Sequence, residues 1–194
     1  PPHVLTPPLE ESPFRATGPS VTMPSDGLLP DDLTATSKIV FQSYLDNNWE
    51  IYVARGNGGY PVRLTYDAAP DLAPRLSPAA LQVAFTSRRT GTYEIFVANV
   101  NGSNLRQVTP NGGDDAGAAW SFDGTRFVYE SYVNGQWDVF VINVDGSNPQ
   151  RLTNSPDYDG TAAWSPDGTK IAFTSRRSGE LGVWVMNADG SGQT

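Results

Sequence analysis

The sequence predicts an all-β fold made of stacked antiparallel sheets, and three observations carry that prediction. Aromatic residues recur at a fixed period of 44 residues, as shown by Phe41, Phe85, Tyr129 and Phe173. Each repeat contains four short runs of strand-forming residues separated by turn residues, and no segment has the period of an amphipathic helix. Four antiparallel strands per repeat of this length describe the blade of a β-propeller. We expect about four blades, three complete or near-complete and one incomplete, preceded by an extended arm.

Residues 1–36 form the expected arm, because their composition differs from that of the rest of the chain. They hold eight of the 16 prolines, and five acidic residues against the single Arg15. Such a composition favours an extended segment over a helix. Part of the arm resembles residues 107–110, which close a repeat, so we expect it to act as a strand donor unless the arm is only a linker. The residues concerned are Ser20, Val21, Thr22 and Met23.

From residue 37 onward, each repeat begins with an inner strand and a tight turn. In the last repeat the inner strand covers residues 162–164, a Ser-Pro-Asp-Gly turn covers 165–168, and the second strand covers 170–174. Asp-Gly and Asn-Gly pairs supply the positive-φ positions that tight hairpins need. We therefore expect each inner strand to form a hairpin with the strand that follows it.

The third strand of each repeat is apolar along its length. Residues 139–142 and 182–186 show no alternation of polar and apolar side chains, which indicates that both faces of the sheet are covered. The sheets must therefore stack face to face. A fourth strand, at 150–153 in the third repeat, completes the blade.

These motifs occur together in a known family of repeats. They are Trp-Ser-Pro-Asp-Gly at 164–168, Ile-Ala-Phe at 171–173, the run at 183–190 and Arg-Leu-Thr at 151–153. Residues 37–194 resemble TolB-type, WD-like propeller repeats, which also build the propellers of prolyl oligopeptidase relatives. The resemblance implies a propeller domain that offers binding surfaces and lies outside the cytoplasm, whether periplasmic, cell-surface or secreted. The first repeat departs from the pattern at residues 56–59 and 77–80, where the Asp-Gly pair is missing.

Composition excludes several classes of function. Thirteen basic residues against 21 acidic ones give a net charge of −8, which opposes the phosphate contacts of a nucleic-acid-binding protein. The chain has no cysteine, so disulfide scaffolds, thiol catalysis and Cys-based zinc sites are excluded. No apolar run approaches the roughly 20 residues that cross a bilayer. We expect protein partners, no nucleic acid and no membrane span.

The sequence offers no catalytic site. Its single histidine, His3, lies in the proline-rich arm, so a Ser-His-Asp triad or a His-based metal site lacks its other members. There is neither a Gly-x-Ser-x-Gly elbow nor a glycine-rich phosphate loop with Lys. We therefore predict no enzyme activity, no cofactor and no metal.

Three aspartates recur at the period of the repeat, just before the inner strands: Asp71, Asp115 and Asp159. The predicted fold sets them around one mouth of the central channel, where they could attract a cation or a basic peptide. The alternative, which we favour, is that each carboxylate accepts backbone hydrogen bonds and fixes the stacking of the blades.

Two pairs of arginines occupy the same turn in the second and fourth repeats. Arginine is favoured at protein interfaces, so this rim is a candidate contact surface. The simpler alternative is a solvated hairpin whose charges keep the rim soluble. The four residues are Arg88, Arg89, Arg176 and Arg177.

The fourth strand of the last repeat would begin beyond Thr194, which leaves a strand edge open for pairing. Residues 20–23 are the expected partner of that edge, either within the molecule or in the next one by β-strand addition. Addition to the next molecule would build rings or filaments. A third alternative is that these repeats are part of a propeller of about six to eight blades.

We therefore expect a non-catalytic β-propeller scaffold for protein–protein interaction that joins copies of itself, through N-terminal strand addition, into an oligomer or an extracellular filament. The alternative is an accessory propeller that gates or docks substrate for a larger peptidase, or a periplasmic TolB-like translocation or envelope protein. An α/β-hydrolase segment elsewhere in the native protein would favour the peptidase alternative.

Overall fold

The computed structural model describes residues 37–109 and 112–194, and within those ranges it contains fourteen β-strands and no helix. The predicted arm at 1–36, including the strand expected at 20–23, lies outside the described residues. No helix in the described part of the chain is long and apolar enough to cross a membrane. The all-β prediction is confirmed.

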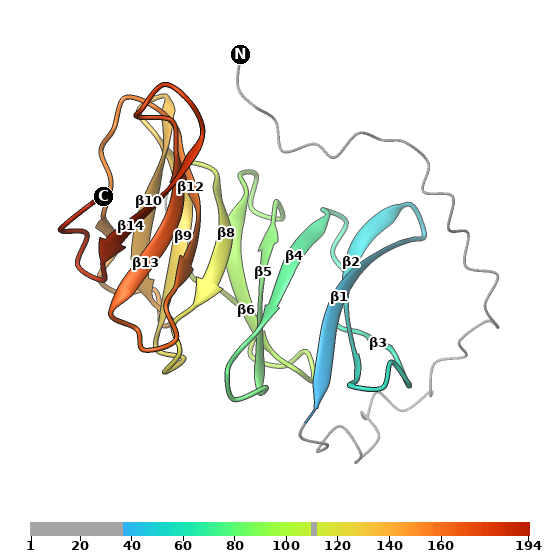
Figure 1. The fold of residues 1–194 in the computed structure, drawn as a ribbon. Helices are drawn as coiled ribbons and strands as arrows, with labels where there is room; N and C mark the ends of the chain where they lie inside the picture. Colours follow the sequence, from blue (N-terminus) through green and yellow to red (C-terminus); the bar gives the residue numbers. More distant parts are fainter. Residues whose placement is uncertain (1–36, 110–111) are drawn as a thin grey trace.

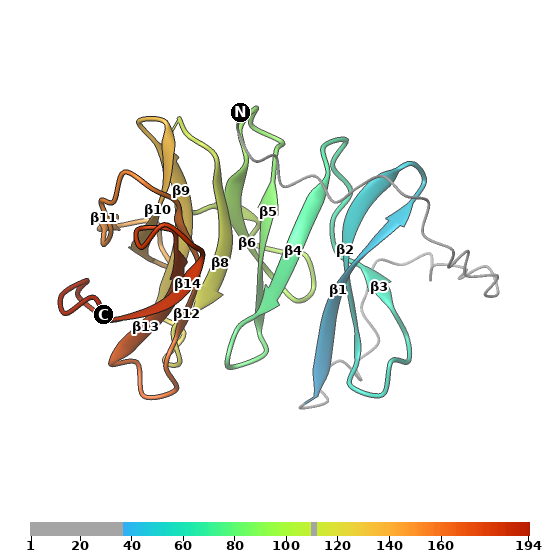
Figure 2. The ribbon, with the colours of Figure 1, turned by 45° about the horizontal axis from the view of Figure 1, so that its top comes forward.

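The strands form four antiparallel sheets that stand side by side in chain order (Figures 1 and 2). We call them blades 1 to 4. Within the described residues, blades 2 and 3 have four strands each, and blades 1 and 4 have three each. Blade 1 comprises β1 (Lys38–Leu45), β2 (Asn48–Arg55) and β3 (Val62–Arg63); blade 2 comprises β4 (Asp71–Leu76), β5 (Gln82–Ser87), β6 (Glu94–Asn99) and β7 (Arg106–Gln107); blade 3 comprises β8 (Asp115–Trp120), β9 (Arg126–Val133), β10 (Gln136–Asn143) and β11 (Gln150–Arg151); blade 4 comprises β12 (Asp159–Trp164), β13 (Lys170–Ser175) and β14 (Gly182–Asn187).

The predicted Ser-Pro-Asp-Gly turn joins β12 to β13 through short polar contacts. The Gly168 N–H donates to the Ser165 carbonyl at 2.9 Å, and Gly168 has a φ of 69°. The Ser165 hydroxyl donates to the Asp167 carboxylate at 2.6 Å, and the Thr169 N–H donates to the same oxygen at 3.0 Å. These hydrogen bonds lower the pKa of Asp167 to about 2. The sequence thus specifies this hairpin locally.

The core lies between the blades. We number the strands of blade 1 as in blades 2 and 3, so that β2, β6, β10 and β14 are the third strands of their blades. At each boundary, aliphatic side chains from the third strand of one blade pack on aromatic side chains from the next blade, and this removes both from water. Ile51 and Val53 of β2 pack in one cluster with Phe85 and Phe96 of blade 2. Equivalent clusters join Ile95 and Val97 to Phe127 and Tyr129, and Val139 and Val141 to Phe173 and Met186. The predicted face-to-face stacking is confirmed.

Candidate functional site

Every blade boundary contains two buried carboxylates, which we call the boundary carboxylates. One lies on the third strand of a blade and the other begins the inner strand of the next blade, and these strands contact each other across each boundary. All six have at most 2% of their surface exposed. The third-strand members are Glu50, Glu94 and Asp138, and the inner-strand members are Asp71, Asp115 and Asp159.

The third-strand carboxylates are held by the threonine that ends each blade. In blade 1, the Thr65 hydroxyl donates to Glu50 at 2.7 Å and accepts the Ile51 N–H at 2.9 Å. This arrangement explains the recurrent Leu-Thr and Val-Thr pairs, because the hydroxyl satisfies a buried acceptor and a buried donor together. The same contacts join Thr109 to Glu94 and Ile95, and Thr153 to Asp138 and Val139.

Arginines neutralise the third-strand carboxylates at the first and third boundaries. Arg63 Nη2 lies 2.6 Å from Glu50 Oε1, and Arg151 Nη2 lies 2.5 Å from Asp138 Oδ2. Each of these arginines also donates through Nε to the carbonyl of the closing threonine, at 2.7 and 2.9 Å. These acids were not predicted from the sequence, although their spacing equals that of the repeat, because each lies near the start of a strand whose next residues are mainly apolar.

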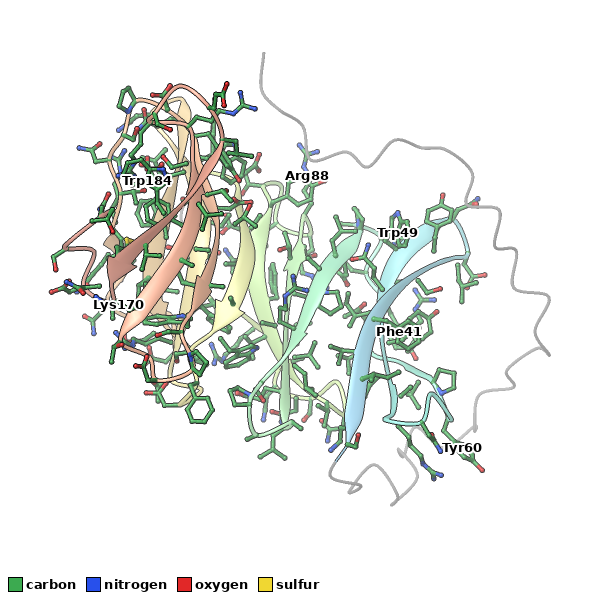
Figure 3. All side chains as sticks on the ribbon, viewed as in Figure 1. Phe41, Trp49, Tyr60, Arg88, Lys170 and Trp184 are labelled. Carbon is green, nitrogen blue, oxygen red and sulfur yellow. The ribbon has the colours of Figure 1, made fainter. Side chains whose placement is uncertain are left out.

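In each of the two predicted arginine pairs, one side chain points inward and the other faces solvent. Arg89 Nη2 lies 2.8 Å from Asp71 Oδ2, and Arg177 Nη2 lies 2.7 Å from Asp159 Oδ2. Arg88 and Arg176 are exposed, and Figure 3 shows Arg88 at the edge of blade 2. Of the proposed contact rim, only these two guanidinium groups face solvent.

The middle boundary, between blades 2 and 3, lacks both arginines. Gln107 takes the place of Arg63 and Arg151, and its amide nitrogen donates to the Thr109 carbonyl at 2.6 Å as the Nε groups do elsewhere. Val133 takes the place of Arg89 and Arg177. As a result, neither Glu94 nor the fully buried Asp115 has an ion-pair partner within the described residues.

Burial without a neighbouring arginine raises the pKa of both Glu94 and Asp115. Desolvation raises the pKa of Asp115 to about 7, and the negative charge of Glu94 adds to the increase, while Ser131 and Thr109 oppose it. Desolvation also raises the pKa of Glu94, against the hydrogen bonds from Thr109 and Thr92. The middle boundary therefore differs chemically from its two neighbours.

The two end blades expose faces that are buried elsewhere in the structure. Val183 and Val185 of β14 are 76% and 40% exposed, whereas their equivalents in blades 2 and 3 are at most 5% exposed. Those equivalents are Ile95, Val97, Val139 and Val141. We call the side of blade 4 that carries Val183 and Val185 the aliphatic end face.

Blade 1 carries the complementary surface at the other end of the row of sheets. Phe41 and Tyr52 are half-buried, and their rings stack with centroids 5.5 Å apart. They occupy the positions of Phe85 and Phe96 of blade 2, which stack at 6.0 Å and pack against blade 1. We call this side of blade 1, where Figure 3 labels Phe41, the aromatic end face.

Comparisons with known proteins agree with this architecture. The family model of the TolB beta propeller domain matches residues 30–138 and 116–194. No curated protein matches the chain.

Several solved structures share the fold. A TolB-type protein from Agrobacterium tumefaciens aligns with a TM-score of 0.72 and 22% identity over 81% of this chain and 60% of its own. TolB from Acinetobacter baumannii aligns with a TM-score of 0.68 and 21% identity over 75% of this chain and 37% of its own. An oligogalacturonate lyase in complex with manganese aligns with a TM-score of 0.65 and 16% identity over 82% of this chain and 49% of its own. The chain thus spans 37 to 60% of the length of these proteins, and the likeness concerns the fold.

Proposed function

Because the chain belongs to the TolB β-propeller family, we propose that it is a non-catalytic protein-binding scaffold that works outside the cytoplasm and joins copies of itself end to end. The observation that carries the proposal is the exposure of the aliphatic end face. Val183 is 76% exposed, although the residues at its position in blades 2 and 3, Ile95 and Val139, are fully buried. Apolar surface of this kind is normally covered by a partner.

The partner that fits this surface best is the aromatic end face of another copy. At all three boundaries inside the molecule, the aliphatic side of one blade packs against the following blade through the positions that Phe41 and Tyr52 occupy in blade 1. Docking blade 4 of one molecule onto blade 1 of the next would repeat that interface. Burying one valine side chain contributes about 1.5 to 3 kcal/mol.

Strand addition would extend the same contact. Val185 and Thr194 exchange two backbone hydrogen bonds of 2.8 and 2.9 Å, and Val141 pairs with Gln150 at the equivalent place in blade 3. Thr194 therefore already pairs with β14 where the fourth strand begins in the other blades, and a donated strand would continue the pairing beyond it or replace it. Residues 20–23 remain our proposed donor for that edge, in the same molecule or in its neighbour.

Two other functions stay open as alternatives. Further blades of a longer chain could cover both end faces, as in an accessory propeller of a peptidase or a TolB-like translocation or envelope protein. The lyase among the similar structures shows that this architecture also occurs in enzymes, so the fold does not decide the question. We favour the scaffold because the repeated polar residues of this chain serve the blade boundaries.

Light scattering after size-exclusion chromatography, over a range of protein concentrations, tests end-to-end assembly. We expect the wild type to associate as concentration rises and the double variant Val183→Glu/Val185→Glu to stay monomeric, because two carboxylates would be buried at the contact. Phe122→Glu is the matched control, since Phe122 is 71% exposed outside both end faces. A wild type that is monomeric at every concentration would contradict self-assembly.

Removing residues 1–27 distinguishes strand donation by residues 20–23 from docking of the two end faces. If strand donation in trans drives assembly, the shortened chain becomes monomeric. If the end faces suffice, it still associates and the double valine variant does not.

A further inference from the structure

We propose that residues 7–13 of the N-terminal arm bind across the hairpin tips of blades 1, 2 and 3 of the same molecule. In this arrangement Pro7 and Pro13 contact two Tyr–Trp pairs, and Glu10 lies against Arg88. The proposal is independent of self-assembly, because this surface lies outside both end faces. It rests on an exposed row of aromatic and basic side chains, on the spacing of the blades and on the spacing of the prolines in the arm.

The β1–β2, β5–β6 and β9–β10 hairpins turn at the same end of the row of sheets (Figure 1). The hairpins of blades 1 and 3 are the longer ones, with strands of eight residues where those of blade 2 have six. Two equivalent positions flank the turn of each hairpin, and we call the six side chains at these positions the hairpin rim. Its members are Tyr44, Trp49, Arg88, Tyr93, Tyr132 and Trp137.

Blades 1 and 3 present the same aromatic pair on the hairpin rim. Tyr44 pairs in register with Trp49, and their ring centroids are 5.3 Å apart. Tyr132 and Trp137 pair in the same way, at 5.4 Å. Tyr44 is 52% exposed and Tyr132 is 36% exposed, so both pairs offer an open aromatic surface. Aromatic surfaces of this kind bind proline-rich segments.

Blade 2 presents a positive charge between the two aromatic pairs. Arg88 is exposed, and its guanidinium carbon lies 5.5 Å from the centre of the Tyr93 ring. Its Nε donates to the Gly91 carbonyl at 3.0 Å, and it forms no salt bridge within the described residues. Figure 3 shows Arg88 and Trp49 at the same end of the row of sheets. From blade 1 to blade 3, the hairpin rim is therefore aromatic, basic and aromatic.

The sequence of the arm carries the complementary pattern. Proline-rich segments favour the polyproline II conformation, whose three residues per turn place side chains three and six positions apart on one side. The residue midway between Pro7 and Pro13 is Glu10, whereas Val4 and Ala16 stand midway in the neighbouring intervals. Only residues 7–13 therefore offer proline, acid and proline on one side. The prolines that recur every six positions are Pro1, Pro7, Pro13 and Pro19.

The spacing of the blades agrees with the spacing of the prolines. Sheets that stack face to face lie about 10 Å apart, so the aromatic pairs of blades 1 and 3, two sheets apart, are separated by about 20 Å. A polyproline II segment rises about 3.1 Å per residue, so Pro7 and Pro13 are about 19 Å apart in that conformation. Glu10 then lies halfway between them, opposite Arg88 of blade 2.

The arm of the same molecule is long enough to reach the hairpin rim. β1 begins at Lys38, at the end of the sheet opposite its hairpin tip (Figure 1), and its eight residues span about 26 Å. Residues 14–36 span up to about 70 Å when extended. Weak contacts are sufficient to hold the arm there, because a tethered segment has an effective concentration of about millimolar.

Paramagnetic broadening in the NMR spectrum of the full chain tests the contact. The chain has no cysteine, so a single spin label can be attached at Thr6→Cys, beside Pro7, or at Ser12→Cys, beside Pro13. We expect one label to broaden the indole N–H signal of Trp49 and the other label to broaden that of Trp137.

Trp120 is the internal control for these spectra. It pairs with Phe127, at the end of β9 opposite the hairpin tip, so its indole signal should stay sharp with either label. If Trp49 and Trp137 also keep sharp signals with both labels, the arm does not bind the hairpin rim and the proposal is overturned.

A mixed sample identifies the molecule that supplies the arm. Isotope-labelled protein without a spin label is mixed with spin-labelled protein without the isotope, so that only contacts between molecules broaden the observed signals. We expect sharp signals in this mixture. Broadening of Trp49 or Trp137 there would show that a second copy supplies the arm, and would overturn the assignment to the same molecule.

Reversing the charge at Arg88 tests the register. Arg88→Glu should lower the ratio of bound to unbound arm about fivefold, the upper range for an exposed ion pair, and adding Glu10→Arg should restore it. Arg176→Glu is the matched control, because Arg176 is exposed at the same position in blade 4, and it should change nothing. If Arg88→Glu behaves like Arg176→Glu, or if the double variant stays unbound, the register is wrong.

Removing one ring of an aromatic pair tests the proline contact. Tyr44→Ser should lower the same ratio about fivefold or more, as truncation of an aromatic hot-spot residue does at an interface. Tyr60→Ser is the matched control, because Tyr60 is 62% exposed at the other end of blade 1 (Figure 3). Both side chains are exposed, so both variants should fold. Equal broadening in the two variants would contradict the proposed contact.

Discussion

Replacing Thr153 with valine removes one hydroxyl group from the boundary between blades 3 and 4 and keeps the shape of the side chain. The hydroxyl donates to Asp138 Oδ1 at 3.2 Å and accepts the Val139 N–H at 2.9 Å. All three residues are at most 2% exposed, so water cannot replace these partners. The substitution therefore leaves a buried N–H group without an acceptor and a buried carboxylate with one donor fewer.

The expected cost follows from those two losses. An unsatisfied buried donor costs about 1 to 3 kcal/mol, and a hydrogen bond to a charged group contributes about 1.5 to 3 kcal/mol. Asp138 keeps its ion pair with Arg151 at 2.5 Å, which reduces the second term. We therefore expect a loss of about 2 to 4 kcal/mol in the free energy of unfolding, or about 5 to 15 °C in melting temperature for a chain of this length.

Urea unfolding followed by circular dichroism measures the loss, with Thr153→Ser as the matched control. Serine keeps the hydroxyl and loses one methyl group, so it should cost only about 1 kcal/mol. The reasoning would be refuted if valine destabilised the protein no more than serine, because the hydroxyl would then contribute nothing beyond packing.

Two further predictions concern charged groups. Arg177→Met leaves Asp159 buried without its counter-ion and should destabilise the protein by about 3 kcal/mol, the lower end for a broken buried ion pair because Arg177 is partly exposed. Arg176→Met, at the exposed neighbour, should change stability by less than about 0.5 kcal/mol, and denaturant midpoints compare the two. The hydrogen bond from Ser165 lowers the pKa of Asp167 below its ordinary value, to about 2. The contribution of this hydrogen bond to stability is therefore present above about pH 4 and is lost as pH falls toward 2. An NMR titration of the Asp167 carboxyl group with a midpoint near 4 would contradict that contact.

The sequence was sufficient to predict the blades because their strands and hairpins depend on local chemistry. The apolar third strands, the Asp-Gly turns and the period of 44 residues all lie within single repeats. The turn at Ser165 is an example, since three residues within five positions supply its hydrogen bonds. Local signals of this kind do not depend on how the blades are arranged.

The inner strands show where local reasoning stopped. Each of β4, β8 and β12 carries a register irregularity at the same place. The central residues there have positive φ angles and include Ala73 at 51° and Thr161 at 50°. In β8 the equivalent residue is Gly117, at 67°, which adopts such angles readily. Alanine and threonine rarely adopt them, so the residue types of β4 and β12 do not predict this conformation.

The sequence alone determined the repeat, the strands and the membership of each blade, because these follow from side-chain periodicity and turn residues close together in the chain. Only the tertiary structure decided which carboxylates have a counter-ion. Arg89 and Arg177 could each have faced solvent beside Arg88 and Arg176, and they turn inward because a buried aspartate lies within reach. Likewise, Asp115 has the same local sequence position as Asp71 and Asp159, and it has no counter-ion because Val133 of β9 replaces their arginine. Electrostatic compensation in a low-dielectric boundary is a property of the packed blades.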